Sequence, residues 1–104
     1  MHQRLNSTEI AHELRQLNRW VLDADKSSIC NEWEFDSFKT SMRFFLNIGE
    51  LAEKLNHHPE LLSNFRHIKI RLNTHDVCGL THRDFELAMK IDQLVNQEFL
   101  GYLR

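Results

Sequence analysis

The sequence predicts an α+β domain with an antiparallel sheet, and three observations support this class. Short apolar segments typical of strands occur in two pairs, near residues 20–35 and 60–73. Longer segments with helical spacing of apolar residues lie at the start, the middle and the end of the chain. One proline and three glycines leave little material for long loops. The predicted order is therefore α-β-β-α-β-β-α.

The size and charge of the chain narrow its class. Its 104 residues fit one domain over 1–104, and 41% hydrophobic with 27% charged residues is typical of globular proteins. A formal net charge of −2 leaves no basic footprint, so we expect no direct nucleic-acid binding. The absence of a signal peptide and of a long apolar run predicts no membrane contact and a cytoplasmic protein, also nuclear in a eukaryote. We expect Cys30 and Cys78 to be reduced thiols.

The first third of the chain predicts one helix and a hairpin. Residues 7–18 place apolar side chains on one helical face, and Ser7 or Thr8 can cap the start. The segment 20–24 has the composition of a short strand, and 28–35 alternates as a half-buried strand does. A polar turn between these two segments predicts that they pair.

The middle of the chain predicts a helix and a second strand pair. Asp36 can cap a helix over about 37–56. This helix should end before Pro59, because a proline disfavours helical geometry in the residue that precedes it. Residues 65–73 alternate between apolar and polar side chains, which predicts a strand with one wet face, and 60–65 is its expected partner.

Phe65 and the start of the last helix are two further features of the second half of the chain. Phe65 has the parity of the polar strand face, so either the strand begins after it or this aromatic side chain faces a pocket. Thr81 and Asp84 have the spacing of a capping box, with Asp in place of Glu. The last helix should therefore begin near His82 and run to Leu103.

Candidate acid–base residues lie at the ends of these elements. His57 and His58 close the second helix, and Glu53, one turn before His57, can hydrogen-bond its imidazole and fix the tautomer. His75 lies at the end of a strand, and Asp84 lies in the first turn of the last helix. Site residues and solvated surface groups are equally open interpretations of the adjacent histidine pair. Three other histidines are expected to be surface groups: His12, His67 and His82.

Other chemistries find little support. Adjacent histidines do not point the same way on a helix or a strand, and no His-x-x-x-His or Cys-x-x-Cys spacing occurs, so we expect no metal. Cys78 lies in a predicted loop with nothing to activate it as a nucleophile. A glycine-rich phosphate loop is missing. The residues therefore favour metal-free chemistry.

One set of residues occurs at spacings that resemble a family signature: Glu53, His57, His58, Pro59, Phe65, His75 and Asp84. The strongest stretches are AEKLNHHPE, THDV and GLTHRDFELA. The chain resembles the pterin-4a-carbinolamine dehydratases, also called 4a-hydroxytetrahydrobiopterin dehydratases. The resemblance covers most of the chain, from about Leu14 to Val95.

The resemblance implies a fold and a site. The family has four antiparallel strands with helices on one face. Its pterin site would be lined by His57, His58 and His75 as acid–base groups, with four supporting positions: Glu53, Pro59, Asp76 and Asp84. Leu61 departs from the usual tryptophan of the family, and Leu62 replaces a more typical aromatic residue.

The resemblance also implies an activity. The substrate would be a 4a-hydroxytetrahydropterin, converted to quinonoid dihydropterin and water in tetrahydrobiopterin recycling, with no cofactor. The departing hydroxide must be protonated and a ring nitrogen must lose a proton, and histidines suit both transfers near neutral pH. In animals the same protein is the dimerisation cofactor of a homeodomain transcription factor. A non-catalytic binding module with a transcription-factor partner is therefore the alternative.

The apolar surface of the last helix favours a contact between subunits. Its apolar residues cover most of the circumference, whereas a helix lying on a sheet needs a stripe somewhat wider than ~100°. Either the helix is deeply buried in its own domain or it contacts another subunit, and we expect the second. The resembled family forms dimers and tetramers, so we predict a homodimer or a tetramer.

Overall fold

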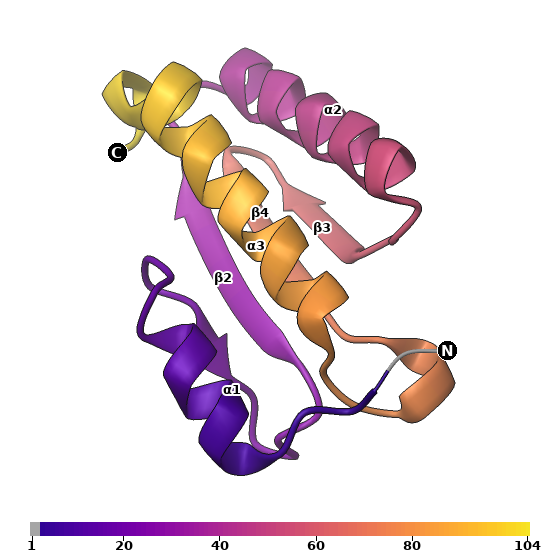
Figure 1. The fold of residues 1–104 in the computed structure, drawn as a ribbon. Helices are drawn as coiled ribbons and strands as arrows, with labels where there is room; N and C mark the ends of the chain where they lie inside the picture. Colours follow the sequence, from indigo (N-terminus) through magenta and orange to yellow (C-terminus); the bar gives the residue numbers. More distant parts are fainter. Residues whose placement is uncertain (1–2) are drawn as a thin grey trace.

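The computed structural model describes residues 3–104, and Figure 1 shows three helices lying on one face of a four-stranded sheet. All neighbouring strands are antiparallel, in the order β1-β2-β4-β3. The predicted fold class and element order are confirmed. The elements are α1 (Ser7–Leu14), β1 (Val21–Leu22), β2 (Ile29–Glu34), α2 (Phe38–Leu55), β3 (Glu60–Asn64), β4 (His67–Leu72) and α3 (His82–Leu94).

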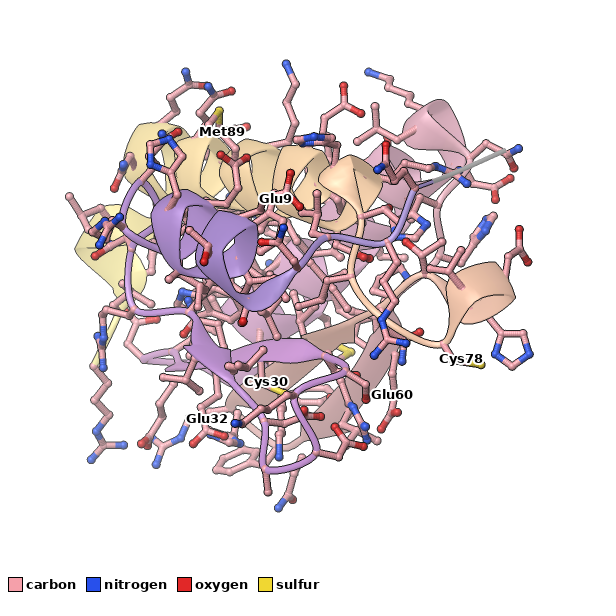
Figure 2. The ribbon with its side chains drawn as sticks, turned by 60° about the horizontal axis from the view of Figure 1, so that its bottom comes forward. Glu9, Cys30, Glu32, Glu60, Cys78 and Met89 are labelled. Carbon is pink, nitrogen blue, oxygen red and sulfur yellow. The ribbon has the colours of Figure 1, made fainter. Side chains whose placement is uncertain are left out.

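The core lies between the sheet and the helices. Alternate residues of β2 and β4 point toward the helices and are buried, as period-two strands require. The opposite face is open and charged, with Glu32 paired across from Lys69. Figure 2 shows Cys30, Glu32 and Glu60 on this open side, away from Met89 of α3. The largest fully buried core side chains include Ile29, Phe35, Phe44, Ile48, Ile68, Ile70, Leu72, Leu87, Ile91 and Phe99.

Two helix caps differ from the prediction. Asn6, not Ser7 or Thr8, caps α1, because its Oδ1 accepts from the Glu9 amide while Glu9 Oε1 accepts from the Asn6 amide, both at 2.9 Å. Ser37, not Asp36, caps α2, and its Oγ accepts from an amide one turn later. The Asp36 amide instead donates to a carbonyl near the C-terminus.

The first helix and the first strand are shorter than predicted. α1 ends at Leu14 rather than at residue 18, and β1 is reduced to Val21–Leu22. Arg19 takes a left-handed φ of 71° between them. Trp20 follows and turns into the core, where its ring meets Trp33 edge-on at 5.8 Å. The buried Trp20 therefore fastens the start of β1 to the core.

Phe65 lies in the hairpin turn between β3 and β4, so the strand begins after it, at His67. Its φ of 57° is unusual for a residue with a large side chain. The ring is exposed and stacks on Phe38 of α2 with centroids 6.4 Å apart. Ser41 Oγ donates to the Phe65 carbonyl at 2.9 Å, which ties this turn to α2.

The last helix begins at His82 with the predicted capping box of Thr81 and Asp84. Past Leu94 its winding changes to a π-helical turn, η2 (Val95–Phe99), and then to a 3₁₀ turn, η3 (Leu100–Tyr102). Most of its apolar side chains are buried in the same domain: Phe85, Leu87, Ala88, Ile91, Val95 and Phe99. Deep burial therefore accounts for the wide apolar surface, and the subunit contact of this helix stays a prediction. None of the described helices has the length and hydropathy needed to span a membrane.

Asp92 fastens the α1–β1 connection to α3. Its carboxylate accepts from Trp20 Nε1 at 2.8 Å and from the Asn18 amide at 2.9 Å. Burial raises the pKa of Asp92, and these two hydrogen bonds offset only part of that effect. The ionised form of Asp92 is therefore less favourable in the folded protein than in the unfolded chain.

We expect Asp92→Asn to change the pH dependence of stability. A group with a raised folded-state pKa stabilises the fold below its unfolded pKa, and that contribution is lost as pH rises through the folded pKa. The melting temperature of Asp92→Asn minus that of the wild type should therefore become more positive from about pH 3.5 to 7. Thermal denaturation across this range measures it, with Asp76→Asn as an exposed control. A difference that falls with rising pH would contradict the prediction.

Candidate functional site

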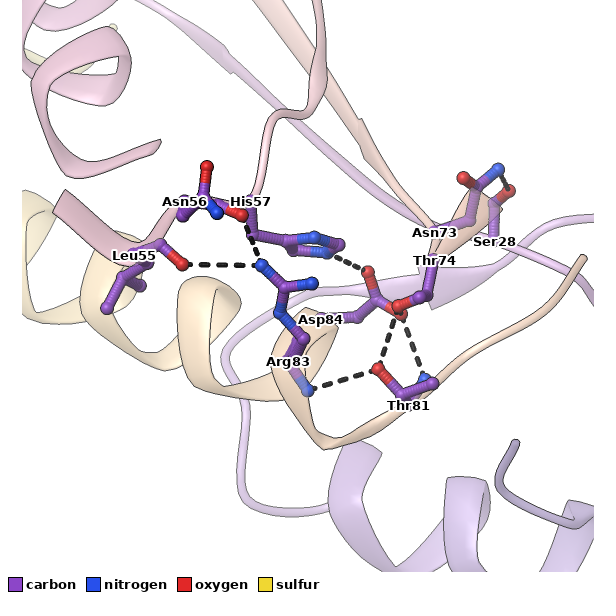
Figure 3. A network of polar contacts seen from close by, with 9 residues as sticks. All are labelled: Ser28, Leu55, Asn56, His57, Asn73, Thr74, Thr81, Arg83 and Asp84. Carbon is purple, nitrogen blue, oxygen red and sulfur yellow. Dashed lines mark hydrogen bonds and ion pairs between the residues drawn. The ribbon is translucent and has the colours of Figure 1, made fainter. Parts of the chain in front are cut away.

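A network of polar contacts lies where the end of α2, the end of β4 and the start of α3 meet (Figure 3). α2 ends in a Schellman motif, because Asn56 takes the left-handed conformation at φ 50° and ψ 44°. The His57 amide donates to the Ala52 carbonyl at 3.0 Å, and the Asn56 amide to the Glu53 carbonyl at 3.2 Å. The helix therefore stops at Leu55, and Asn56 rather than Pro59 ends it. This reversal turns His57 inward and leaves His58 outside.

His57 and Asp84 form a buried pair. His57 Nε2 lies 2.5 Å from Asp84 Oδ1, His57 is 7% exposed and Asp84 is fully buried. The other carboxylate oxygen accepts from Thr74 Oγ1 and from the Thr81 amide, each at 2.9 Å. Three polar groups thus contact the Asp84 carboxylate, one at Oδ1 and two at Oδ2. A buried carboxylate requires such partners, because it has lost its hydrogen bonds to water.

The donors in this network specify one tautomer of His57. The Thr81 amide and the Thr74 hydroxyl both donate to Asp84 Oδ2. Thr81 Oγ1, 2.7 Å from Thr74 Oγ1, then donates to it and accepts from the Arg83 amide. When Asp84 is ionised, its Oδ1 can only accept, so His57 Nε2 then donates the shared proton. Nδ1 is left as the ring nitrogen that can accept a proton.

Arg83 joins α3 to the end of α2. Its guanidinium donates to the Asn56 carbonyl and, at 3.4 Å, to the Leu55 carbonyl (Figure 3). These carbonyls lie at the C-terminal end of a helix, where a cation is favourable. The contact holds the left-handed turn that precedes His57.

Glu53 pairs with His58, and the expected contact with His57 is wrong. Glu53 Oε2 lies 2.5 Å from His58 Nε2, and both side chains are more than half exposed. The reason is the Schellman motif: the chain reverses after Leu55, so His58 rather than His57 returns to the helix surface. The structure thus contains two histidine–carboxylate pairs, one buried and one exposed.

His75 lies just past the end of β4 rather than within the strand. β4 ends at Leu72, and His75 begins a 3₁₀ turn, η1 (His75–Val77), that also carries Asp76. Both side chains are exposed. Thr74, which contacts Asp84, directly precedes His75, so the start of η1 adjoins the buried network. Pro59 is half-buried and leads into β3.

Sequence reasoning found part of this site. It selected Asp84 and both histidines, but it treated Thr81 only as a cap and passed over Thr74 and Arg83. A hydroxyl partner of a buried carboxylate has no recognisable spacing, because Thr74 and Asp84 meet only after the fold forms. Within residues 3–104, no three or more histidine, cysteine, aspartate or glutamate side chains are grouped to hold a metal. Cys30 and Cys78 are not joined in a disulfide.

The fold and the site define an α+β domain with paired histidines beside carboxylates at the ends of its elements. Residues 3–94 match the family model for pterin 4 alpha carbinolamine dehydratase, so the chain belongs to this family.

Relatives agree with this assignment. A protein of Sinorhizobium medicae provisionally named pterin-4-alpha-carbinolamine dehydratase is 41% identical over 91 residues, which cover 88% of this chain and 87% of the relative. A protein of Saccharolobus solfataricus with the same provisional name is 36% identical, over 85% of this chain and 90% of the relative.

Solved structures show the same fold. A transcriptional coactivator/pterin dehydratase from Brucella melitensis superposes with a TM-score of 0.85 at 30% identity, over 88% of this chain and 98% of that one. A pterin dehydratase-like protein described as a RuBisCO assembly factor in the alpha-carboxysome superposes at 0.64 over 74% of this chain and 89% of that one. At 17% identity, this second likeness shows the fold alone.

Proposed function

We propose that this protein dehydrates 4a-hydroxytetrahydropterins to quinonoid dihydropterins by histidine acid–base catalysis. The observation that carries the proposal is the buried His57–Asp84 pair, which holds one histidine in a defined tautomer within a chain of the dehydratase family. Asp84 touches the histidine rather than the substrate in this proposal, so it is a positioning residue. His58 and His75 are the further candidates for proton transfer.

The reaction divides into two proton movements. The bond between ring carbon 4a and its hydroxyl oxygen breaks, and that oxygen takes a proton to leave as water. A ring nitrogen gives up its proton as the new carbon–nitrogen double bond forms, so one proton enters and one leaves. His57 Nδ1 is suited to accept the nitrogen proton, because its Nε2–H is held by Asp84. A protonated His58 or His75 would supply the other proton, and Glu53 is placed to support His58.

Purified protein assayed directly for carbinolamine dehydration tests the proposal. We expect the protein to accelerate the reaction well above its spontaneous rate, both with and without a chelator, because no metal takes part in the proposed steps. A folded protein that leaves the spontaneous rate unchanged would contradict the catalytic proposal. Activity that is lost on chelation and restored by zinc would contradict the metal-free mechanism.

His75→Ala should reduce turnover more than stability. The side chain is exposed at the start of η1, so its removal leaves no core cavity. If His75 transfers a proton, we expect the rate to fall by about 10²-fold or more, with the melting temperature almost unchanged. His82→Ala is a matched control, since it removes another exposed histidine. A near-normal rate in His75→Ala would show that His75 does not transfer a proton in the reaction.

A binding role is the second candidate function. It is favoured by the 30% identical Brucella melitensis structure, whose name includes transcriptional coactivator. Leu61 also takes the place expected of an aromatic residue, and the structure packs it half-buried against the core. In this alternative the protein folds and contacts a transcription-factor partner without accelerating dehydration, so the same assay separates the two functions.

We further propose that the chain forms a homo-oligomer through α2. One side of this helix faces away from the core and is apolar: Phe38 and Leu46 are 51% and 68% exposed, and Met42 and Phe45 are half-buried beside them. An added Cβ at Gly49 would meet no atom within 4 Å, so the surface there is open.

Light scattering at micromolar concentration should therefore report a dimer or a tetramer. Leu46→Glu should shift the protein toward the monomer, because it places a charge in the proposed contact. Val21→Glu, on an exposed position of β1, is the control and should leave the mass unchanged. A wild type with the mass of one chain would refute self-association.

A further inference from the structure

A cavity lies apart from the histidine network. It has a volume of about 480 Å³, within the ~300–1,000 Å³ range of small-molecule sites. It is formed by the N-terminal segment, α1, β1 and the start of the α3 region, and shares no lining residue with the network in Figure 3. Its walls are mainly aliphatic: Leu5, Ile10, Ala11, Leu14, Leu22 and Leu80.

Two cations lie at its rim. Arg4 and Lys26 line the cavity together with Asn6 and Ser7 at the start of α1. Neither cation has an ion-pair partner among the described residues. No aspartate or glutamate of the described chain lines the cavity. Among the described residues, the lining therefore presents two unpaired cations and no carboxylate, beside an apolar interior.

The position of Arg4 is set by the backbone around it. The Leu5 amide donates to the Leu80 carbonyl at 2.8 Å, which fastens the N-terminal segment to the loop before α3. The Arg4 side chain then crosses directly over Gly79, where an added Cβ would lie only 2.6 Å from Arg4 Nε. A glycine at this point thus permits the close approach that holds the guanidinium at the cavity mouth.

We propose that this cavity binds a small amphipathic carboxylate. Its aliphatic body fills the space among the leucines, which removes apolar surface from water. Its carboxylate lies at the rim, where Arg4 and Lys26 supply the opposite charge. Neither the apolar contact nor the charge contact depends on pterin chemistry. A test of this site therefore gives a result that is independent of the proposed dehydratase activity.

Titration of the isotope-labelled protein with octanoate, followed by amide NMR shifts, tests the site. Octanol and octylammonium, with the same chain but neutral and positive head groups, are run in parallel. We expect octanoate to bind at about millimolar concentration, octanol more weakly and octylammonium most weakly. The shifts should map to Leu5, Ala11 and Leu80 rather than to the open sheet face.

Two variants separate charge from shape. The double change Arg4→Gln and Lys26→Gln should weaken octanoate binding about tenfold, since each exposed charge contact is worth roughly threefold, and should leave octanol binding unaltered. Lys39→Gln with Lys90→Gln removes two cations elsewhere and should leave octanoate affinity as it is. Ala11→Phe fills the cavity and should reduce binding of both octanoate and octanol in a protein whose circular dichroism is native.

Several results would overturn the proposal. Absence of saturable shifts with octanoate, shifts that map away from the cavity, or equal affinity for octanoate and octylammonium each contradict it. An Arg4→Gln, Lys26→Gln protein that binds octanoate as tightly as the wild type would show that the cations have no part in recognition.

Discussion

Replacing His57 by alanine is expected to lower the dehydration rate by about 10²–10⁴-fold, the range typical of a lost acid–base group. His57 is the histidine whose tautomer the fold defines, because its Nε2 faces Asp84 at 2.5 Å in a buried setting. Stopped-flow measurement of carbinolamine dehydration gives the rate, and the pH–rate profile should lose one limb. Pterin binding should weaken far less than turnover.

A second variant, His57→Gln, separates the loss of a catalytic group from a loss of stability. Alanine leaves Asp84 without one of its donors, whereas glutamine places an amide near the position of Nε2 and can donate to that carboxylate. His57→Gln should therefore melt closer to the wild type and yet lose the same catalytic power. His67→Gln, on the open sheet face, is the control. Wild-type turnover in His57→Gln would remove His57 from the mechanism.

Replacing Asp84 by alanine should cost about 3–5 kcal/mol of the free energy of unfolding, the range measured when one partner of a buried pair is removed. The change leaves three buried donors unpaired: His57 Nε2, the Thr74 hydroxyl and the Thr81 amide. It also removes half of the capping box at the start of α3. Urea denaturation monitored by circular dichroism measures the loss.

Asp84→Asn separates the positioning role from the structural one. An asparagine keeps one acceptor oxygen, so stability should fall less than in Asp84→Ala. It cannot accept from His57 and from both threonine donors at once, so the imidazole tautomer is no longer specified. We expect a displaced pH–rate profile in Asp84→Asn. Asp76→Ala, an exposed control, should stay within about 0.5 kcal/mol of the wild type. An equally small loss in Asp84→Ala would contradict the role of the network.

The helix boundaries show where local sequence signals are sufficient to predict the structure. The start of α3 follows from the spacing of Thr81 and Asp84, because a capping box satisfies amides within one turn. The start of α2 lies one residue later than predicted, because Ser37 rather than Asp36 caps the helix with its side chain. α2 ends at Leu55, close to the predicted end at about residue 56 and before Pro59. The left-handed turn at Asn56, a conformation that asparagine tolerates but does not impose, sets this boundary.

Local patterns along the chain were sufficient to predict the fold class, the order of the elements and the residues at which a site could form. These features depend on periodicity, capping and spacing, which act within a few residues along the chain. Which carboxylate meets which histidine depends instead on tertiary packing. The pairing of His57 with Asp84, 27 residues away, needs α2, β4 and α3 to be packed together. The same packing buries one histidine and leaves its neighbour in water, because a single left-handed residue between helix and strand directs their side chains to opposite sides.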